Sequence, residues 1–443
     1  MRFCQLSVRY LSPAALKPYG GNARTHSPKQ LRQIADSIRQ FGFVSPILVD
    51  RGNGVIAGHG RLAAAKLLGM EKVPTVALEH MTDAEKRAYI LADNKLAENA
   101  GWDPEILRIE LQYLAGLDLG FDLTITGFST PEIDMVLCGE AEDRDDILPD
   151  LPAKPVTQPG DLWLLGEHRL LCGDATQPAA FRRLMSGKRA QMIFVDPPYN
   201  VRIDGHARGL GRTRHREFAM ASGEMTAEQF RDFLGNAFHL LARHSVSGAI
   251  HFVCMDWRHL EETLTAGKEA YAELKNLIVW NKANAGMGSF YRSKHELILA
   301  FKYGTAPHIN NFSLGEHGRH RSNVWDYAGV SGFRQDRAEE LLIHPTVKPI
   351  AMVVDAIKDC SHRGGIVLDS FLGSGTTLIA AERTGRIGYG IELDPIYVDV
   401  ALRRWMDVSG GTPKLADSGH KYSRVAEDRG VGKPVKSRRV AHV

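Results

Sequence analysis

The sequence predicts an α/β protein in which a small α+β domain precedes a larger domain built on a mainly parallel sheet. Three observations support this fold class. From Pro159 onwards, short apolar runs alternate with amphipathic segments, as in strand–loop–helix repeats. Before that point, Glu140–Gln158 is acidic and rich in proline, so it can bury little surface and should separate the two parts. The chain has 443 residues, 44% of them hydrophobic and 24% charged, which suits two or three globular domains.

The first domain, residues 1–100, is expected to contain helices and strands. Ser27, followed by proline, is a typical helix N-cap, and apolar residues then recur at helical spacing. Two short strands, Ile47–Asp50 and Val55–Ala57, come next, and Gly58–Arg61 opens a further helix. Free backbone N–H groups at that helix start, beside a basic residue, suit an anion, although a helix cap with a surface arginine explains the same residues.

Residues 101–139 are expected to form a helical appendix, because Pro104 and Ser129 each open an apolar helical segment. A helix-turn-helix is conceivable, but the loop between the segments is long for one, so we predict a packing element. The last residues, 411–443, are polar and contain eight Lys/Arg against three acids, which predicts a disordered tail with some nonspecific DNA affinity. The expected parts are therefore residues 1–100, 101–139, the linker 140–158, the large domain 159–410 and the tail 411–443.

The most informative stretch is Gln191–Asn200, QMIFVDPPYN. Its apolar part predicts a buried strand, which must end at Asp196 because the prolines that follow cannot donate to a sheet ladder. Residues just past such a strand lie where α/β sheets bind their ligands. The Asp196 carboxylate and the Pro197 carbonyl can both accept hydrogen bonds from one amino group, and Tyr199 offers a face for a flat ring. The competing interpretation is a cis-proline turn with a capped strand end.

The second informative stretch, Ile366–Tyr397, contains a strand, a glycine turn, a helix and another strand. The turn Phe371–Thr376 lets backbone approach a ligand closely, and Glu392 at the end of the second strand can bind both ribose hydroxyls. A dinucleotide motif would need a third glycine where Leu378 stands, and a phosphate-binding loop would need a lysine that is absent. An adenosyl ligand without a pyrophosphate is left, and S-adenosylmethionine fits.

Together the two stretches resemble the motifs of the DNA amino-methyltransferases, which methylate adenine N6 or cytosine N4 of a base flipped out of the duplex. The catalytic motif comes before the cofactor motif, as in the β-class enzymes, and the resemblance covers about Pro159–Met406. It implies a Rossmann-like S-adenosylmethionine-dependent methyltransferase sheet. Carried over residue by residue, it implies a catalytic set of Asp196, Pro197, Pro198 and Tyr199 and a cofactor set of Asp174, Lys348, Asp369, Phe371, Gly373, Gly375, Thr376 and Glu392.

The same resemblance places target recognition between the two motifs. It favours adenine over cytosine, because the cytosine members more often have serine where Asp196 stands. DNA contacts are expected from Asn284–Lys294 and from two arginine-rich stretches, for which a solvated loop or a plain insertion is the alternative. The arginines expected to contact DNA are Arg319, Arg321, Arg334 and Arg337, interleaved with aromatic residues, and Arg212 and Arg214.

The first domain resembles the ParB-like nuclease domain in the segments VSPILVD, VIAGHGRLAAAKLLG, VPTVAL and ILADNKLAENAGWD. In ParB proteins the glycine–arginine box contributes to binding a cytidine nucleotide and DNA. Here His59 and Gly60 stand where those proteins usually have an acid and a second arginine. The resemblance implies a phosphate contact at Gly58, His59 and Arg61 and leaves its source open between a nucleotide and DNA.

The expected partner is double-stranded DNA; β-class relatives are often dimers, which favours a homodimer, and a restriction endonuclease partner stays open. Two other functions stay open as well. One is the same chemistry on RNA or on a protein amide, for which asparagine at position 196 would be more typical. The other is a ParB-like DNA-binding module with an inert methyltransferase domain.

Composition limits the classes of protein to which this chain could belong. The net charge is only +3, so any nucleic-acid signal must be local. Five scattered cysteines without a C-x-x-C pair argue against a zinc site and fit a reducing cytosol. No apolar run approaches a membrane span, and the N-terminus lacks a signal-peptide pattern. We therefore predict a soluble cytoplasmic protein without a metal site.

Overall fold

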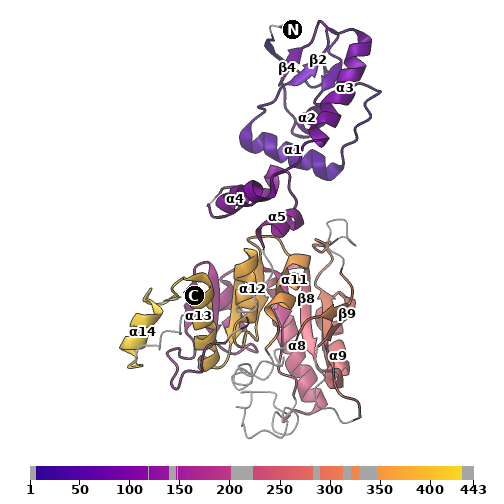
Figure 1. Ribbon diagram of the computed structural model, residues 1–443. Helices are drawn as coiled ribbons and strands as arrows, with labels where there is room; N and C mark the ends of the chain where they lie inside the picture. The colour runs from indigo at the N-terminus through magenta and orange to yellow at the C-terminus, as the bar shows by residue number, and fades with distance from the viewer. Residues whose placement is uncertain are drawn as a thin grey trace. The chain divides into compact units, whose positions relative to one another are not determined.

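The computed structural model describes residues 6–117, 119–138, 146, 148–200, 223–282, 290–312, 321–328 and 347–431. The chain divides into two compact units, Met1–Leu137 and Cys138–Val443. Each unit has its own sheet and its own hydrophobic core, so we describe them separately (Figure 1).

The first unit contains a four-stranded sheet in the order β1-β4-β2-β3, with β2 parallel to β4 and the other pairs antiparallel. As predicted, Ser27 caps the first helix, because its hydroxyl accepts a hydrogen bond from the Gln30 N–H at 3.1 Å. The elements are β1 Val8–Leu11, α1 Pro28–Phe41, β2 Ile47–Val49, β3 Val55–Ala57, α2 His59–Leu67, β4 Val73–Ala77 and α3 Asp83–Glu98.

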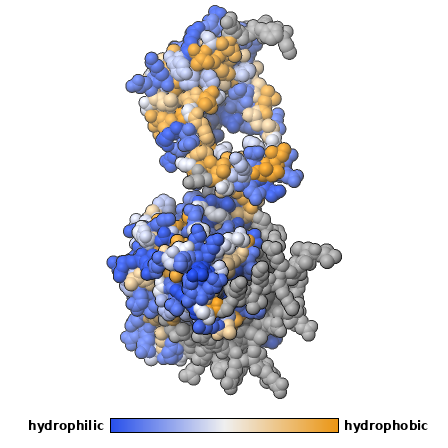
Figure 2. All heavy atoms as spheres, turned by 90° about the vertical axis from the view of Figure 1, so that its left-hand side faces the viewer, coloured by the Kyte–Doolittle hydropathy of each residue, from blue (hydrophilic) through white to orange (hydrophobic). Residues whose placement is uncertain are grey.

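Three short helical elements complete the first unit: α4 Pro104–Ala115, the 3-10 helix η1 Leu123–Thr126, and α5 Thr130–Leu137. Several large apolar side chains of α4 are exposed, among them Ile106, Ile109 and Tyr113. Figure 2 shows hydrophobic patches on the face of this unit that is turned toward the viewer.

The second unit is built on a ten-stranded sheet in the order β11-β9-β10-β8-β7-β12-β13-β6-β5-β14. Its five central strands, β8 to β6 in this order, are parallel, as the sequence predicted, and antiparallel pairs flank them on both sides. The strands are β5 Leu162–Leu165, β6 His168–Cys172, β7 Ala190–Val195, β8 Ser245–Met255, β9 Glu273–Asn281, β10 His295–Lys302, β11 Val324–Asp326, β12 Ile366–Asp369, β13 Ile387–Glu392 and β14 Lys414–Leu415.

Helices cover both faces of this sheet, and alternate side chains of each central strand pack on one face or the other. In β7, Met192 and Phe194 join the core beneath α11, α12 and α13, while Ile193 and Val195 join the core beneath α6, α8 and α9. Figure 1 shows α8 beside α9 and α11 beside α12. The helices are α6 Pro178–Met185, α8 Ala227–Arg243, α9 Leu260–Ala270, α11 Ile350–Cys360, α12 Thr376–Thr384, α13 Pro395–Ser409 and α14 Tyr422–Asp428, with a 3-10 turn, η3, at Trp257–His259.

The tail prediction is wrong for the stretch that contains β14, Lys414–Leu415, and α14, Tyr422–Asp428. Tyr422 is 2% exposed, and its ring centroid lies 5.4 Å from that of Trp163 in the sheet. Arg429 donates to both oxygens of Asp161, at 3.0 Å to Oδ1. The high charge of the segment hid the few apolar residues that anchor it, since burying one aromatic side chain stabilises a fold by roughly 2 kcal/mol.

The last residues of the predicted linker also pack on the second unit. The buried Asp399 carboxylate accepts hydrogen bonds from the backbone N–H groups of Val156 and Thr157 and from the Thr157 hydroxyl. Within the part of the chain that the structure describes, we find no helix long and apolar enough to cross a membrane.

Candidate active site

Four neighbouring parallel strands of the second unit each lead into a carboxylate. Asp196 follows β7, Asp369 ends β12, Glu392 ends β13, and Asp174 lies just after β6. The strands are adjacent in the order β7-β12-β13-β6, and the carboxyl ends of parallel strands meet at one edge of a sheet. The structure thus brings the predicted catalytic acid and three predicted cofactor residues into one row.

Asp196 lies in a compact cluster with Tyr199, Lys348 and Glu296. The Tyr199 hydroxyl donates to Asp196 Oδ1 at 2.6 Å, and Lys348 Nζ donates to Asp196 Oδ2, also at 2.6 Å. Lys348 Nζ further donates to the Tyr199 hydroxyl at 3.0 Å and lies 3.1 Å from Glu296 Oε2. Pro197 is buried and Pro198 half-buried, and the described residues contain no cis peptide bond. The turn therefore presents Asp196 and Tyr199 to the same point.

Charges in this cluster are costly to hold out of water, because the Lys348 side chain is only 4% exposed. Burial lowers the pKa of an ammonium, but Asp196 and Glu296 outweigh burial and raise the pKa of Lys348. Burial raises the pKa of Asp196 against the opposing effect of Lys348. Burial also acts to raise the pKa of Glu296, but Lys348 and Lys282 outweigh it and lower that pKa to about 2. Lys348 thus stays charged and compensates two buried carboxylates.

Sequence reasoning missed Glu296, Lys282 and Asn200. Glu296 is the second residue of β10 and pairs with both Lys282 and Lys348; an acid near the start of an otherwise apolar strand was the available signal. Asn200 has φ 52°, and its side chain binds the backbone of Gly223 and of Met225. The available signal was an asparagine directly after the Pro-Pro-Tyr turn, since asparagine is enriched at left-handed backbone positions.

The glycine turn after β12 is tied to the acids by backbone hydrogen bonds. The Phe371 N–H donates to Asp369 Oδ1 at 2.9 Å, and the Thr377 hydroxyl donates to Asp369 Oδ2 at 2.7 Å. The Gly373 N–H donates to Glu392 Oε2 at 2.8 Å, so the turn and the end of β13 are held together. Burial raises the pKa of Asp369 and that of Glu392 to about 7 each.

The other two predicted turn residues have packing roles in the structure. Gly375 has φ 92°, and a Cβ there would lie 2.8 Å from Ala401 Cβ, so this glycine lets α12 approach α13. The Thr376 hydroxyl accepts a hydrogen bond from Arg404 at 3.2 Å. On the loop after β6, Asp174 accepts hydrogen bonds from the N–H and the hydroxyl of Thr176.

Most of the predicted DNA-contacting arginines, namely Arg212, Arg214, Arg319, Arg334 and Arg337, lie outside the described residues. Arg321 is described, and its contacts are internal. It pairs with Asp359 at 3.0 Å, lies 3.4 Å from Asp355, and stacks on Trp325 with its guanidinium carbon 4.7 Å from the ring centroid. Trp325 is itself in the core. These contacts anchor the chain before β11, so we do not carry Arg321 forward as a DNA contact.

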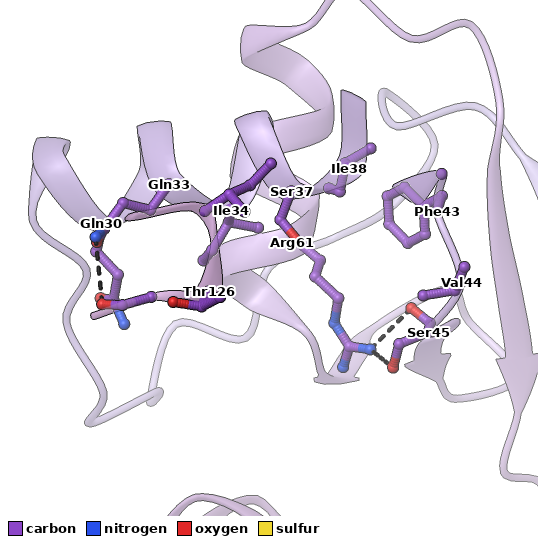
Figure 3. A pocket seen from close by; sticks show the side chains of 13 residues that line it. Gln30, Gln33, Ile34, Ser37, Ile38, Phe43, Val44, Ser45, Arg61 and Thr126 are labelled. Atoms are coloured by element: carbon purple, nitrogen blue, oxygen red, sulfur yellow. Dashed lines mark hydrogen bonds between the residues drawn. The ribbon is translucent and has the colours of Figure 1, made fainter. Parts of the chain in front are cut away.

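The glycine–arginine box of the first unit also makes internal contacts. Gly58 caps α2 with φ 98°, and the His59 ring accepts a hydrogen bond from the Tyr19 N–H. Arg61 donates to the carbonyl and the hydroxyl of Ser45. It lines a pocket of about 360 Å³ between α1, the chain before β2 and η1; Figure 3 shows its guanidinium directed at Ser45. A phosphate contact at this box stays a prediction.

Three family models match the chain. Residues 190–403 match the DNA methylase family of N6 and N4 methyltransferases, residues 4–95 match the ParB N-terminal domain, and residues 105–159 match the ParB-methyltransferase HTH domain. The last match corrects our preference for a packing element over a helix-turn-helix. A long connection between its helices, which includes η1, had hidden the motif.

Relatives support both halves of this architecture. The ParB-like nuclease domain-containing protein YnaK of Escherichia coli K12 is 45% identical over 83 residues, which are 19% of this chain and 95% of YnaK. The type II methyltransferase M.HinfI of Haemophilus influenzae is 27% identical over 261 residues, which are 54% of this chain and 69% of that protein. The chain contains a DNA methylase domain of the N6/N4 family, whose cofactor is S-adenosylmethionine, and a ParB-like N-terminal domain.

Among solved structures, the PvuII DNA methyltransferase (cytosine-N4-specific) is 14% identical to this chain. The match covers 64% of this chain and 98% of that one, with a TM-score of 0.42. Because the TM-score is below 0.5, this likeness carries no conclusion about the base that is methylated.

Proposed function

We propose that this protein transfers a methyl group from S-adenosylmethionine to the N6 amine of an adenine flipped out of double-stranded DNA. The observation that carries the proposal is the row of four carboxylates, in which the Asp196–Tyr199 pair stands beside the turn predicted to hold the cofactor. One site for the amine and one for the methyl donor then lie side by side at the same sheet edge.

The residues around the turn fit an adenosyl ligand. Both Glu392 oxygens accept a backbone N–H, at 2.8 Å from Gly373 and from Asp394, and each keeps a lone pair for a ribose hydroxyl. The Ser370 hydroxyl in the same turn is buried and has no hydrogen-bond partner within the described residues, so a ligand could satisfy it. S-adenosylmethionine, when bound there, supplies a methyl group on a positively charged sulfur.

In this proposal Asp196 orients the amine by accepting a hydrogen bond from it, and the Pro197 carbonyl accepts the second. Lys348 lowers the pKa of Asp196 against the rise that burial causes, and so favours the ionised form of Asp196 that accepts hydrogen bonds. The amine must lose one proton when it gains the methyl group, and we assign the acceptance of that proton to the Asp196 carboxylate. Positioning of the two reactants is the main contribution to rate.

Tyr199 stacks on the base once it has left the duplex, which stabilises the flipped state by roughly 1–3 kcal/mol. Its hydroxyl is held by Asp196 and Lys348, so the ring has one fixed orientation. Aspartate at position 196 favours adenine, while N4 of cytosine is the alternative acceptor with the same geometry.

The test is methylation-aware sequencing of DNA from a bacterial host without DNA methylation that expresses this protein, beside an Asp196→Ala control. We expect N6-methyladenine at one short sequence motif with the wild-type protein and none with the variant. Methylcytosine at the motif would show that cytosine, and not adenine, is the acceptor. An unmodified genome, with the protein folded and binding S-adenosylmethionine, would contradict the proposal.

A further inference from the structure

Two adjacent aromatic side chains, Phe290 and Tyr291, stand almost free of the protein surface. They are 86% and 81% exposed, the highest values among the large hydrophobic residues that the structure describes. Their ring centroids lie 4.5 Å apart at 71°, so the two rings form one edge-to-face unit. Neither ring contributes to the cores of the second unit.

The strand pairing places this aromatic pair at the catalytic edge of the sheet. In β10, which runs antiparallel to β8, Leu297 pairs with Met255 at the carboxyl end of β8. His295 at the start of β10 pairs with Asn281 at the end of β9. The β9–β10 connection, which contains Phe290 and Tyr291, therefore leaves the sheet at the edge where Asp196 lies.

The base of this connection is joined directly to the catalytic cluster. Glu296 Oε2 lies 3.1 Å from the Tyr199 hydroxyl and 3.1 Å from Lys348 Nζ, and Glu296 also pairs with Lys282 at the other end of the connection. The stem on which the aromatic pair is mounted is thus fixed relative to the residues that face the target base.

Charge at this connection identifies the kind of partner. Between Asn281 and His295 the sequence has three cations, Lys282, Arg292 and Lys294, and no acid. Arg292 and Lys294 are exposed. Cations alone would serve phosphate contacts, whereas two exposed rings beside them suit stacking on bases. Duplex DNA offers both phosphates and bases.

We propose that Phe290 and Tyr291 enter the duplex beside the target base pair and stack on the bases that the flipped nucleotide leaves behind. This inference rests on the proposed base flipping. Removing a base from the helix loses stacking and pairing. Apolar side chains inserted at the step compensate for that loss, as wedge residues do in proteins that kink DNA. Arg292 and Lys294 hold the adjacent backbone.

The experiment compares the variant Phe290→Ala/Tyr291→Ala with the wild-type protein on two duplexes that contain the motif found by sequencing. One duplex is fully paired, and in the other the target base is mispaired and flips more readily. We expect the variant to methylate the paired duplex about ten- to hundredfold more slowly and the mispaired duplex at close to the wild-type rate. Equal losses on both duplexes, or no loss on either, would overturn the inference.

Two further variants separate the aromatic effect from its neighbours. Leu274→Ala removes a part-exposed apolar side chain from the opposite end of β9 and should leave both rates unchanged. Arg292→Ala/Lys294→Ala should weaken binding to both duplexes equally and make the binding affinity depend less on salt concentration. If the aromatic variant instead changes only the oligomeric state in sedimentation, the rings form a protein interface and the inference is wrong. Wild-type protein without activity on either duplex would count against the proposed function itself.

Discussion

The raised pKa of Glu392 makes S-adenosylmethionine binding depend on pH in a direction that can be worked out. Burial is the main cause of the rise, from an ordinary value of 4.5 to about 7. In the proposed complex a ribose hydroxyl donates to the ionised carboxylate, so the ionised form is the one expected to bind the cofactor. At pH 6 only about a tenth of the free protein carries ionised Glu392, and the apparent dissociation constant should be about tenfold higher than at pH 8 or above.

The assay is calorimetric titration of S-adenosylmethionine between pH 5.5 and 8.5, for the wild-type protein and for Glu392→Gln. The wild-type affinity should fall with decreasing pH, whereas the variant should bind weakly at every pH and lose most of the dependence. Burial also raises the pKa of Asp369 to about 7, and because Asp369 is unchanged in the variant, its effect is common to both profiles. An affinity that does not vary with pH, or the same profile in both proteins, would refute the role of Glu392.

The titration of Glu392 cannot weaken cofactor binding at low pH by unfolding the protein. A carboxyl whose pKa is higher in the folded protein than in the unfolded chain binds its proton more tightly when folded. Its contribution to stability is therefore fully present below about pH 4.5 and is lost as the pH rises through about 7. Lowering the pH from 8 to 6 weakens cofactor binding through Glu392 while the same group stabilises the cofactor-free fold, and thermal melts in parallel would separate the two effects.

Three other variants test the packing around the site. Lys348→Met should abolish methyl transfer and lower the free energy of unfolding by about 3 kcal/mol, because two buried carboxylates lose their shared cation. The double variant Lys348→Met/Glu296→Gln should recover part of the stability but not the activity. If the two substitutions had fully additive effects on the free energy of unfolding in urea melts, the cluster would be contradicted. Gly375→Ala should lower the free energy of unfolding by about 1–3 kcal/mol, because the added Cβ meets Ala401 and φ at this position is positive. Adding Ala401→Gly should restore part of the lost stability. A Gly375→Ala variant as stable as the wild type would show that the two helices are not in contact. A chain ended after residue 410 should melt at a lower temperature than one ended after residue 431, since only the longer chain keeps Tyr422 against Trp163; equal melting temperatures would contradict the packing of α14.

The parts of this protein that could be predicted are those in which local chemistry determines structure. Proline after Asp196 must end a strand, and a serine before proline must begin a helix, so β7 and α1 followed from the sequence. A glycine turn between two apolar runs was recognisable for the same reason. These features fix the row of carboxylates, because parallel strands end at one edge.

The parts that could not be predicted depend on contacts between residues far apart in the chain. Lys348 was expected to face the cofactor, and its contact with Asp196 spans 152 residues. Glu296 carried no motif, and its role follows from the pairing of β10 with β8 and β9. Arg321 looked like a DNA contact because arginines often are, but the carboxylate of Asp359 and the face of Trp325 take up its guanidinium. Sequence pattern indicates what a side chain can do, whereas packing decides whether it is available.

The central claim is that Asp196 orients the amine that receives the methyl group. The most direct measurement is nucleoside mass spectrometry of motif-containing DNA incubated with purified protein and S-adenosylmethionine, for the wild type and for Asp196→Ala, with cofactor affinity measured in the same samples. We predict N6-methyladenine from the wild type and at least a hundredfold less from the variant, about 3 kcal/mol in the barrier, at unchanged cofactor affinity. Methylated adenine at the wild-type rate from Asp196→Ala would contradict the account.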